Sequence, residues 1–212
     1  MEKKPYKTLL KAASDEIVIN KSRSIGDGRP CETEEEALEF IREIRARYRD
    51  ATHHCYAYII GPNMGIMRYS DDGEPGGTAG MPMIEVLKAR GVTNCAVVVT
   101  RYFGGILLGA GGLVRAYTQG AAIAVNACGV GTIYPTARYL IEVSYPMLNR
   151  MDYFLKGEPV VVEDKSFTDV ITYTLLIRSS DETGFLQRAA NMSEGALDPL
   201  RYEEIYWPWA EE

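Results

Sequence analysis

The side chains best suited to chemistry gather in two short segments, and the acidic loop, residues 70–80, is the first of them. Its sequence places three carboxylates, Asp71, Asp72 and Glu74, within four residues. Carboxylates this close could hold a metal ion or act as general acid and base, and His53 could join them. The alternative is a plain turn, because Asp, Gly and Pro are all turn formers.

Both histidines of the chain, His53 and His54, are adjacent in the sequence. On a strand they would point to opposite faces, so they cannot both serve one site. The spacings typical of zinc hydrolases and of EF-hand calcium loops are missing. We therefore expect no bound metal ion and no cofactor, and we assign no catalytic residue.

The glycine-rich run, residues 101–115, is the second segment. Five of the nine residues from 104 to 112 are glycine, and Arg101 and Arg115 stand at the ends of the run. The run lacks the Gly-Lys-Ser/Thr of a Walker phosphate loop, and Val114 stands where a dinucleotide fingerprint needs Gly or Ala. A strand, a glycine loop and a helix N-terminus remain, and free amides at such a terminus can bind phosphate.

The aromatic residues of the run, Tyr102 and Phe103, could stack on nucleic-acid bases. The alternative is close helix–sheet packing permitted by glycine, with both aromatic rings in the core. The candidate residues for binding an anion or a nucleic acid are Arg101, Tyr102, Gly104, Gly105, Gly109, Gly111, Gly112 and Arg115.

Charge is distributed unevenly along the chain. The net charge is −6, yet no Asp or Glu occurs between Val86 and Ile141. That span contains Lys88 and four arginines, whereas residues 138–212 hold 7 basic and 14 acidic side chains. Local charge decides what a surface attracts, so the acid-free span could face an anionic partner. A buried segment would exclude carboxylates equally well.

Composition indicates an ordinary globular protein. Hydrophobic residues make up 46% and charged residues 25% of the 212 residues, which argues against disorder. The four cysteines are widely spaced and form no Cys-x-x-Cys pair, so we expect free thiols in a reducing cytoplasm. No secretory signal and no membrane-spanning run is recognised, so we expect a cytoplasmic protein without a membrane partner.

The hydrophobic pattern predicts two domains, residues 1–135 and 136–212. In the first, Thr33 and Glu36 form a capping box that opens a helix, and the residues expected on one face of that helix are Ala37, Leu38, Ile41, Ile44 and Tyr48. Further elements are expected at 14–25 (strand, turn, strand), 55–60 (strand), 81–90 (helix), 94–100 (strand) and 112–126 (helix). The second domain has the order βαββαβ, which predicts a ferredoxin-like sandwich.

Three segments taken together, 51–57 (ATHHCYA), 70–80 (SDDGEPGGTAG) and 99–117 (VTRYFGGILLGAGGLVRAY), closely resemble the YigZ/IMPACT family. The resemblance covers about residues 15–130, and the chain from 138 onward resembles the small C-terminal domain of bacterial members. Ser24 stands where the family usually has Phe. The resemblance implies a mixed α/β (α+β) fold. It pairs a βαβ sandwich like a ribosomal-protein domain with a ferredoxin-like domain similar to the last domain of elongation factor G.

The resemblance also implies a role in translation, because eukaryotic members are implicated in regulating it during amino-acid starvation. Our main hypothesis is a non-enzymatic regulator that binds RNA, the ribosome or a translation factor through the glycine-rich run. One alternative is a metal-assisted hydrolase or peptidase-like enzyme that uses the acidic loop and His53. Another is an interaction scaffold that acts through the acidic C-terminal domain. The sequence predicts no oligomeric state.

Overall fold

The computed structural model describes residues 4–209, which form two compact units. The first unit is Pro5–Thr132, and the second runs from Ile133 onward and includes Lys4. Together they have a mixed α/β fold with two five-stranded sheets. Every strand pairing for which a register is defined is antiparallel. The predicted fold class is thus confirmed, and each unit is described below by itself.

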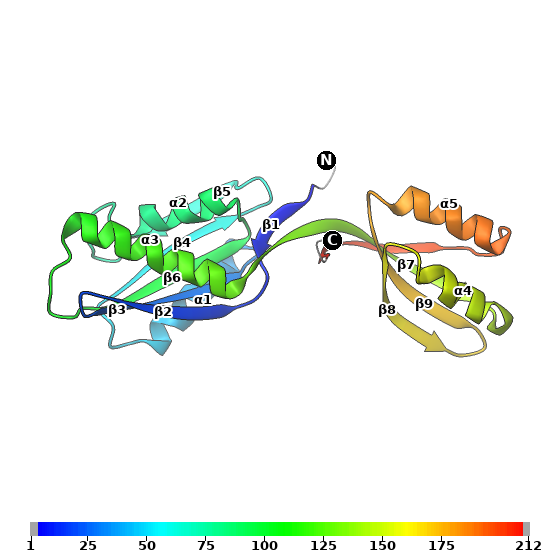
Figure 1. Ribbon diagram of the computed structural model, residues 1–212, viewed down its shortest axis with the longest axis horizontal. Coiled ribbons are helices and arrows are strands. Elements are labelled where there is room, and N and C mark those ends of the chain that lie inside the picture. The colour runs from blue at the N-terminus through cyan, green and yellow to red at the C-terminus, as the bar shows by residue number, and fades with distance from the viewer. Residues whose placement is uncertain (1–3, 210–212) are drawn as a thin grey trace. The chain divides into compact units, whose positions relative to one another are not determined.

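The first unit is built on a sheet of strand order β2-β3-β6-β4-β5 (Figure 1). Strand β6 lies at its centre and is buried along nearly its whole length. The strands of this unit are β1 (Tyr6–Leu9), β2 (Ala13–Ile19), β3 (Ser22–Pro30), β4 (His53–Ile60), β5 (Ile66–Ser70) and β6 (Cys95–Tyr102). The helices are α1 (Glu34–Arg47), α2 (Gly80–Arg90) and α3 (Gly109–Cys128).

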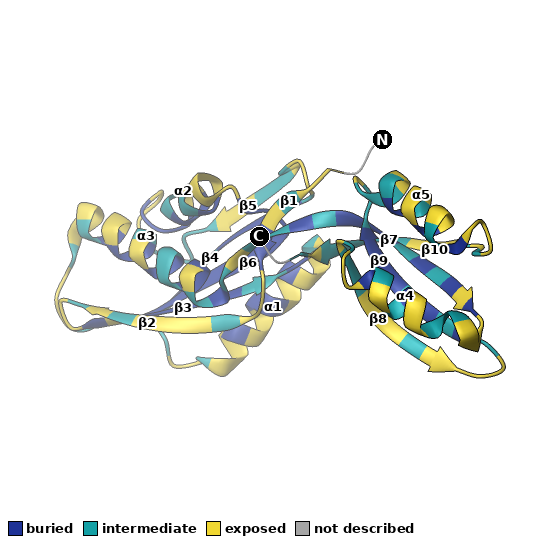
Figure 2. Cartoon of the chain, turned by 45° about the vertical axis from the view of Figure 1, so that its right-hand side comes forward, coloured by how far each residue is buried: buried dark blue, intermediate teal, exposed yellow. Residues whose placement is uncertain are grey.

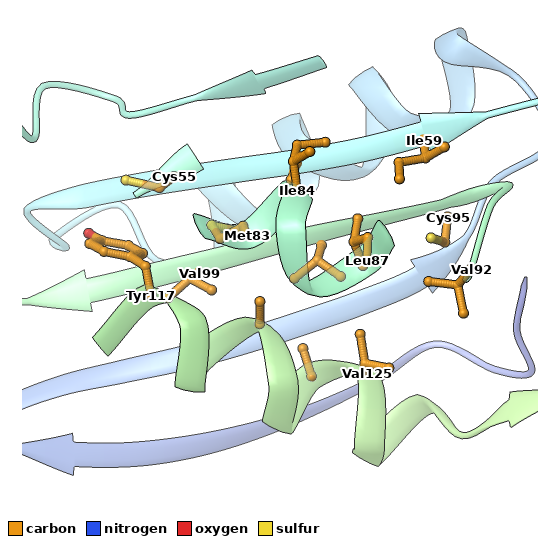
Figure 3. Packing of buried hydrophobic residues seen from close by; sticks show 14 of the residues in the cluster. Cys55, Ile59, Met83, Ile84, Leu87, Val92, Cys95, Val99, Tyr117 and Val125 are labelled. Atoms are coloured by element: carbon orange, nitrogen blue, oxygen red, sulfur yellow. The ribbon is translucent and has the colours of Figure 1, made fainter. Parts of the chain in front are cut away.

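Helices cover both faces of this sheet because β6 alternates its side chains between two cores. Cys95, Val97 and Val99 pack with α2 and α3, whereas Ala96 and Val98 pack with α1. Figure 3 shows α2 and α3 side by side over the strands, with Met83 and Leu87 of α2 directed into the first core. Strands buried on both faces read as continuous apolar runs, as β6 does.

The helix boundaries follow local signals at α1 and α2. The Thr33 hydroxyl accepts a hydrogen bond from the Glu36 amide at 3.2 Å, as expected for an N-cap. The Glu36 carboxylate, however, accepts from the Glu32 amide at 2.8 Å, one residue before the predicted partner. Helix α2 ends at Gly91, which adopts the left-handed conformation with φ +66°.

Helix α3 begins inside the glycine-rich run, at Gly109 rather than at residue 112. It is held by unusually close packing on the sheet: a Cβ on Gly26 of β3 would lie 2.3 Å from the Gly120 carbonyl oxygen. A Cβ on Gly120 would in turn lie 2.9 Å from Val99 of β6. Glycine at these positions lets α3 rest directly on β3 and β6, and tertiary packing thereby outweighs the low helix propensity of the run.

The second unit confirms the predicted ferredoxin-like order βαββαβ. Its sheet has the order β10-β7-β9-β8. Both helices pack on one face, where Met151 and Phe185 meet alternate residues of β7 and β9 (Figure 2). The elements are β7 (Val130–Val143), the 3₁₀ turn η1 (Tyr145–Met147), α4 (Leu148–Leu155), β8 (Val160–Phe167), β9 (Ile171–Arg178), α5 (Glu182–Ser193) and β10 (Leu200–Pro208).

All four cysteines, Cys31, Cys55, Cys95 and Cys128, are buried and are free thiols, as their wide spacing in the sequence predicts. Within residues 4–209, no helix combines the length and the hydropathy needed to cross a membrane.

The Gly26 contact can be tested by adding a single methyl group. We expect Gly26→Ala to lower the free energy of unfolding by about 3 kcal/mol, because the new Cβ overlaps the backbone of α3. Gly76→Ala is the matched control, since a Cβ there meets nothing within 4 Å. Urea unfolding followed by circular dichroism measures both variants. Equal stability of the two variants would contradict the close packing of α3 on β3.

Candidate functional site

A cavity of about 400 Å³ lies where the C-terminal end of β6 meets the N-terminus of α3. Its walls are mostly apolar, and the first two residues of α3, Gly109 and Ala110, line it as well. The apolar lining residues are Pro75, Phe103, Leu107, Leu108 and Leu113. A concave, mainly apolar cavity with a few polar groups is the usual form of a ligand site.

The polar floor of the cavity is an ion pair between Glu74 and Arg101. The Nη1 atom of Arg101 donates to Oε1 of Glu74 at 2.9 Å, and each side chain is only 5% exposed. The Tyr117 hydroxyl of α3 donates to the same oxygen at 2.7 Å. Acidic loop, central strand and helix therefore meet at one carboxylate oxygen.

His53 stands beside this pair, opposite Arg101 in the β4–β6 register. Its Nδ1 lies 2.8 Å from the Asp72 carbonyl oxygen, and since a carbonyl can only accept, Nδ1 carries a hydrogen. In the neutral ring Nε2 is then an acceptor, and it lies 3.9 Å from Oε2 of Glu74. Both atoms belong to residues that line the cavity.

Arg101 has further neighbours on the side away from Glu74. Its Nη2 donates to the Ser22 hydroxyl at 3.3 Å, and its guanidinium carbon lies 5.7 Å from the Phe103 ring centroid. Its buried Nε has no hydrogen-bond partner among the residues described. A buried donor left unpaired is costly, and because this Nε is enclosed by protein atoms it adds no donor to the cavity.

Two more ionisable groups near the floor stay protonated. Burial, and then the neighbouring Cys55 and Glu74, raise the pKa of Tyr117 far above its usual range. Burial also raises the pKa of Cys55 to about 12, and its thiol donates to the Asp71 carbonyl. Tyr117 is therefore a hydrogen-bond donor, and Cys55 is not a thiolate nucleophile at neutral pH.

The three carboxylates of the acidic loop point to three different places. Asp71 accepts hydrogen bonds from the amides of Gly77, Ala79 and Gly80, and so closes its own loop onto the start of α2. Asp72 accepts from Arg45 and from the His54 amide, both at 2.7 Å. Only Glu74 reaches the cavity. The described part of the chain holds no group of three or more His, Cys, Asp or Glu side chains fit for a metal ion.

The two histidines serve different purposes. His53 lines the cavity, whereas His54 is buried with its Nε2 2.9 Å from the Tyr48 carbonyl oxygen. Of the four residues predicted at the acidic loop, His53 and Glu74 thus come together, and Asp71 and Asp72 do not join them.

The arginines of the glycine-rich run also separate. Arg101 is buried, whereas Arg115 is exposed and lies outside the cavity lining. The Tyr102 hydroxyl donates to Asp50 at 3.0 Å, and the ring lies near Arg23 of β3. Phe103 is 47% exposed, so it is not a core residue.

At most glycine positions of the run, the structure explains why glycine is needed. A Cβ on Gly104 would lie 2.1 Å from the backbone of Lys21, and one on Gly112 would lie 2.9 Å from Leu108. Gly105 and Gly109 adopt positive φ angles of +80° and +66°. A Cβ on Gly111, in contrast, would meet nothing within 4 Å.

Sequence reasoning missed Tyr117 and the apolar wall. The one available signal for Tyr117 is general: the hydroxyl of a buried tyrosine needs a hydrogen-bond partner. Leu107 gave no signal, because nothing in the sequence distinguishes an exposed leucine from a buried one.

The hydrogen bonds of Asp71 make a prediction about acid stability. Burial alone would raise the pKa of Asp71, but hydrogen bonds from Gly77, Gly80 and Ala79 outweigh it and hold that pKa below its ordinary value of 3.8. Asp71 therefore contributes stability that is complete above about pH 5 and is lost as the pH falls through the lowered pKa. We expect the stability difference between wild type and Asp71→Asn to be constant above that pH and to shrink below it.

Denaturant unfolding from pH 2 to 7 measures this difference, with Glu39→Gln as control, since Glu39 is exposed on α1. The same pH dependence for both variants would contradict the role of the Asp71 hydrogen bonds.

Comparison with known proteins covers both units. The Impact N-terminal domain matches residues 20–125, and a domain of unknown function, DUF1949, matches residues 141–196. The IMPACT family member YvyE of Bacillus subtilis is 37% identical over 206 residues, which cover 95% of this chain and 93% of that protein. The IMPACT family member YigZ of Escherichia coli is 34% identical over 200 residues, which cover 92% of this chain and 98% of that protein.

Two further matches are consistent with these relatives. The Protein IMPACT homolog of Dictyostelium discoideum is 44% identical over 62 residues, which are 28% of this chain and 17% of that protein. The crystal structure of a hypothetical protein matches with a TM-score of 0.61 at 31% identity, and covers 95% of this chain and 99% of its own. Because full-length relatives share more than a third of their residues with it and both domains match in order, the chain belongs to the IMPACT family.

Proposed function

We propose that this protein regulates translation by docking a protein of the translation apparatus, a ribosomal protein or a translation factor, on its docking loop, residues 103–108. The IMPACT family is associated with translation regulation, which supports the proposed role in translation. The geometry of the loop supports a protein as the partner.

The observation that carries this proposal is the exposure of apolar side chains along the docking loop. Leu107 is 87% exposed, Phe103 47% and Ile106 43%. Phe103 and Leu107 also line the mouth of the cavity, so the exposed side chains border a concave apolar surface. Clustered apolar exposure of this kind is typical of protein-binding surfaces, where a few large side chains dominate the affinity.

The charges around the loop favour protein over RNA. A phosphate-binding loop needs free cations, but Arg101 is buried against Glu74. Arg115 and Lys21 remain exposed, and the backbone of Lys21 lies against Gly104 of the loop, which suits a partner with an acidic rim. A protein surface that binds RNA would present many more cations, because contacts with phosphate groups dominate the affinity for RNA.

The test is co-sedimentation with purified ribosomes, with and without added translation factors. We expect Leu107→Asp to weaken binding at least about tenfold, since a charge replaces an apolar anchor. Val18→Asp is the matched control, because Val18 is also exposed (66%) but lies on β2. It should bind as the wild type does.

A salt series separates the two classes of partner. Apolar docking should change little between low and moderate salt, whereas RNA binding should fall steeply. Unchanged binding by Leu107→Asp would refute the proposal. Binding that Arg115→Ala alone abolishes, with a steep salt dependence, would instead support an RNA partner.

A further inference from the structure

We propose that the cavity at the end of β6 binds an uncharged ligand with an amide edge, that is, an N–H donor beside a carbonyl oxygen, on a flat apolar body. This inference concerns the interior of the cavity and does not depend on the docking of a protein by the exposed loop. It rests on the charge, the hydrogen bonds and the walls of the cavity.

The charge of the floor argues for an uncharged ligand. Oε1 of Glu74 and Nη1 of Arg101 are 2.9 Å apart, and both side chains are nearly fully buried, so the two charges cancel at the floor. Around them the walls are apolar. An ion brought into such a place would lose its hydration without gaining an unpaired counter-charge, which is unfavourable.

The acceptors of the floor point to an N–H donor on the ligand. Oε1 of Glu74 already receives two hydrogen bonds, from Arg101 and Tyr117. Oε2 receives none from residues 4–209, and Nε2 of His53 lies 3.9 Å from it. When the His53 ring is neutral, its one hydrogen lies on Nδ1, and Nε2 of His53 and Oε2 of Glu74 are then two acceptors 3.9 Å apart. An NH₂ group has two hydrogens and could satisfy both.

The donors of the site point to a carbonyl on the same ligand. Helix α3 has 20 residues, and its first turn has neither a side-chain cap nor an acidic residue. Its leading N–H groups have no acceptor within the helix, and Gly109 and Ala110 line the cavity. A carbonyl oxygen could accept from this side while the NH₂ group faces His53 and Glu74.

The volume and the walls of the cavity limit the size and shape of the ligand. A volume of about 400 Å³ is at the small end of ligand sites, so it suits a single ring that bears the amide. Phe103 offers an aromatic face and Leu107 an aliphatic edge at the mouth. Benzamide has this chemistry and is the probe of choice.

The experiment compares three probes that share one ring and differ in charge: benzamide, benzoate and benzamidine. Protein-observed NMR on the full chain gives the dissociation constants and shows whether the shifted signals lie around His53 and Gly109. We expect benzamide to bind with a Kd on the order of 1–10 mM and at least about fivefold more tightly than either ion. Tighter binding of benzoate would make this an anion site, and tighter binding of benzamidine a cation site. Either outcome overturns the proposal, as does equal or undetectable binding of all three.

Variants then test the assigned contacts. His53→Ala should weaken benzamide binding about fivefold through loss of one acceptor, whereas His53→Gln, which keeps an acceptor oxygen, should retain most of the affinity. Val114→Ala is the control, since Val114 is exposed on α3 outside the cavity lining. Wild-type affinity in His53→Ala would contradict the proposed orientation. No ribosome is present, so failure here leaves the docking proposal untouched.

Discussion

The buried ion pair between Glu74 and Arg101 is the interaction on which the functional region depends. It joins the acidic loop to the end of the central strand β6, and Tyr117 attaches α3 to the same carboxylate. Burying two charges is costly, and removing one partner leaves the other charge without compensation. The pair therefore anchors the acidic loop to β6 and, through Tyr117, to α3, and both of its residues line the cavity.

Because of this ion pair, the charged side chains of the region make contacts within the protein. Asp71 and Asp72 brace the loop through backbone amides, Arg45 and the His54 amide, which leaves Glu74 and His53 at the cavity. The outer surface of the glycine-rich run is consequently apolar, with Leu107 and Phe103 exposed. The glycine-rich run thus exposes apolar side chains on its outside, whereas its Arg101 forms the neutral floor of the cavity together with Glu74. That division is the physical basis of both proposed activities.

Much of the fold could be predicted from local patterns. Thr33 starts α1 and Gly91 ends α2 through short-range signals, and the βαββαβ order of the second unit follows from hydrophobic periodicity. The site could be predicted only in part. His53, Glu74 and Arg101 are chemically conspicuous, but no local rule pairs Glu74 with an arginine 27 residues away. Arg101 consequently looked like a surface cation. The start of α3 at Gly109 also escaped prediction, because contacts with β3 and β6, not propensity, stabilise it.

The most direct measurement of the central ion pair is a double-mutant cycle on Glu74→Gln and Arg101→Met, read as free energies of unfolding. Each single variant should cost about 3–5 kcal/mol, because it leaves a buried charge or donor without its partner. The double variant should cost at least about 2 kcal/mol less than the two single costs combined, since neither charge then remains. Additive costs would mean that Glu74 and Arg101 do not depend on each other, and would contradict the role given to this pair.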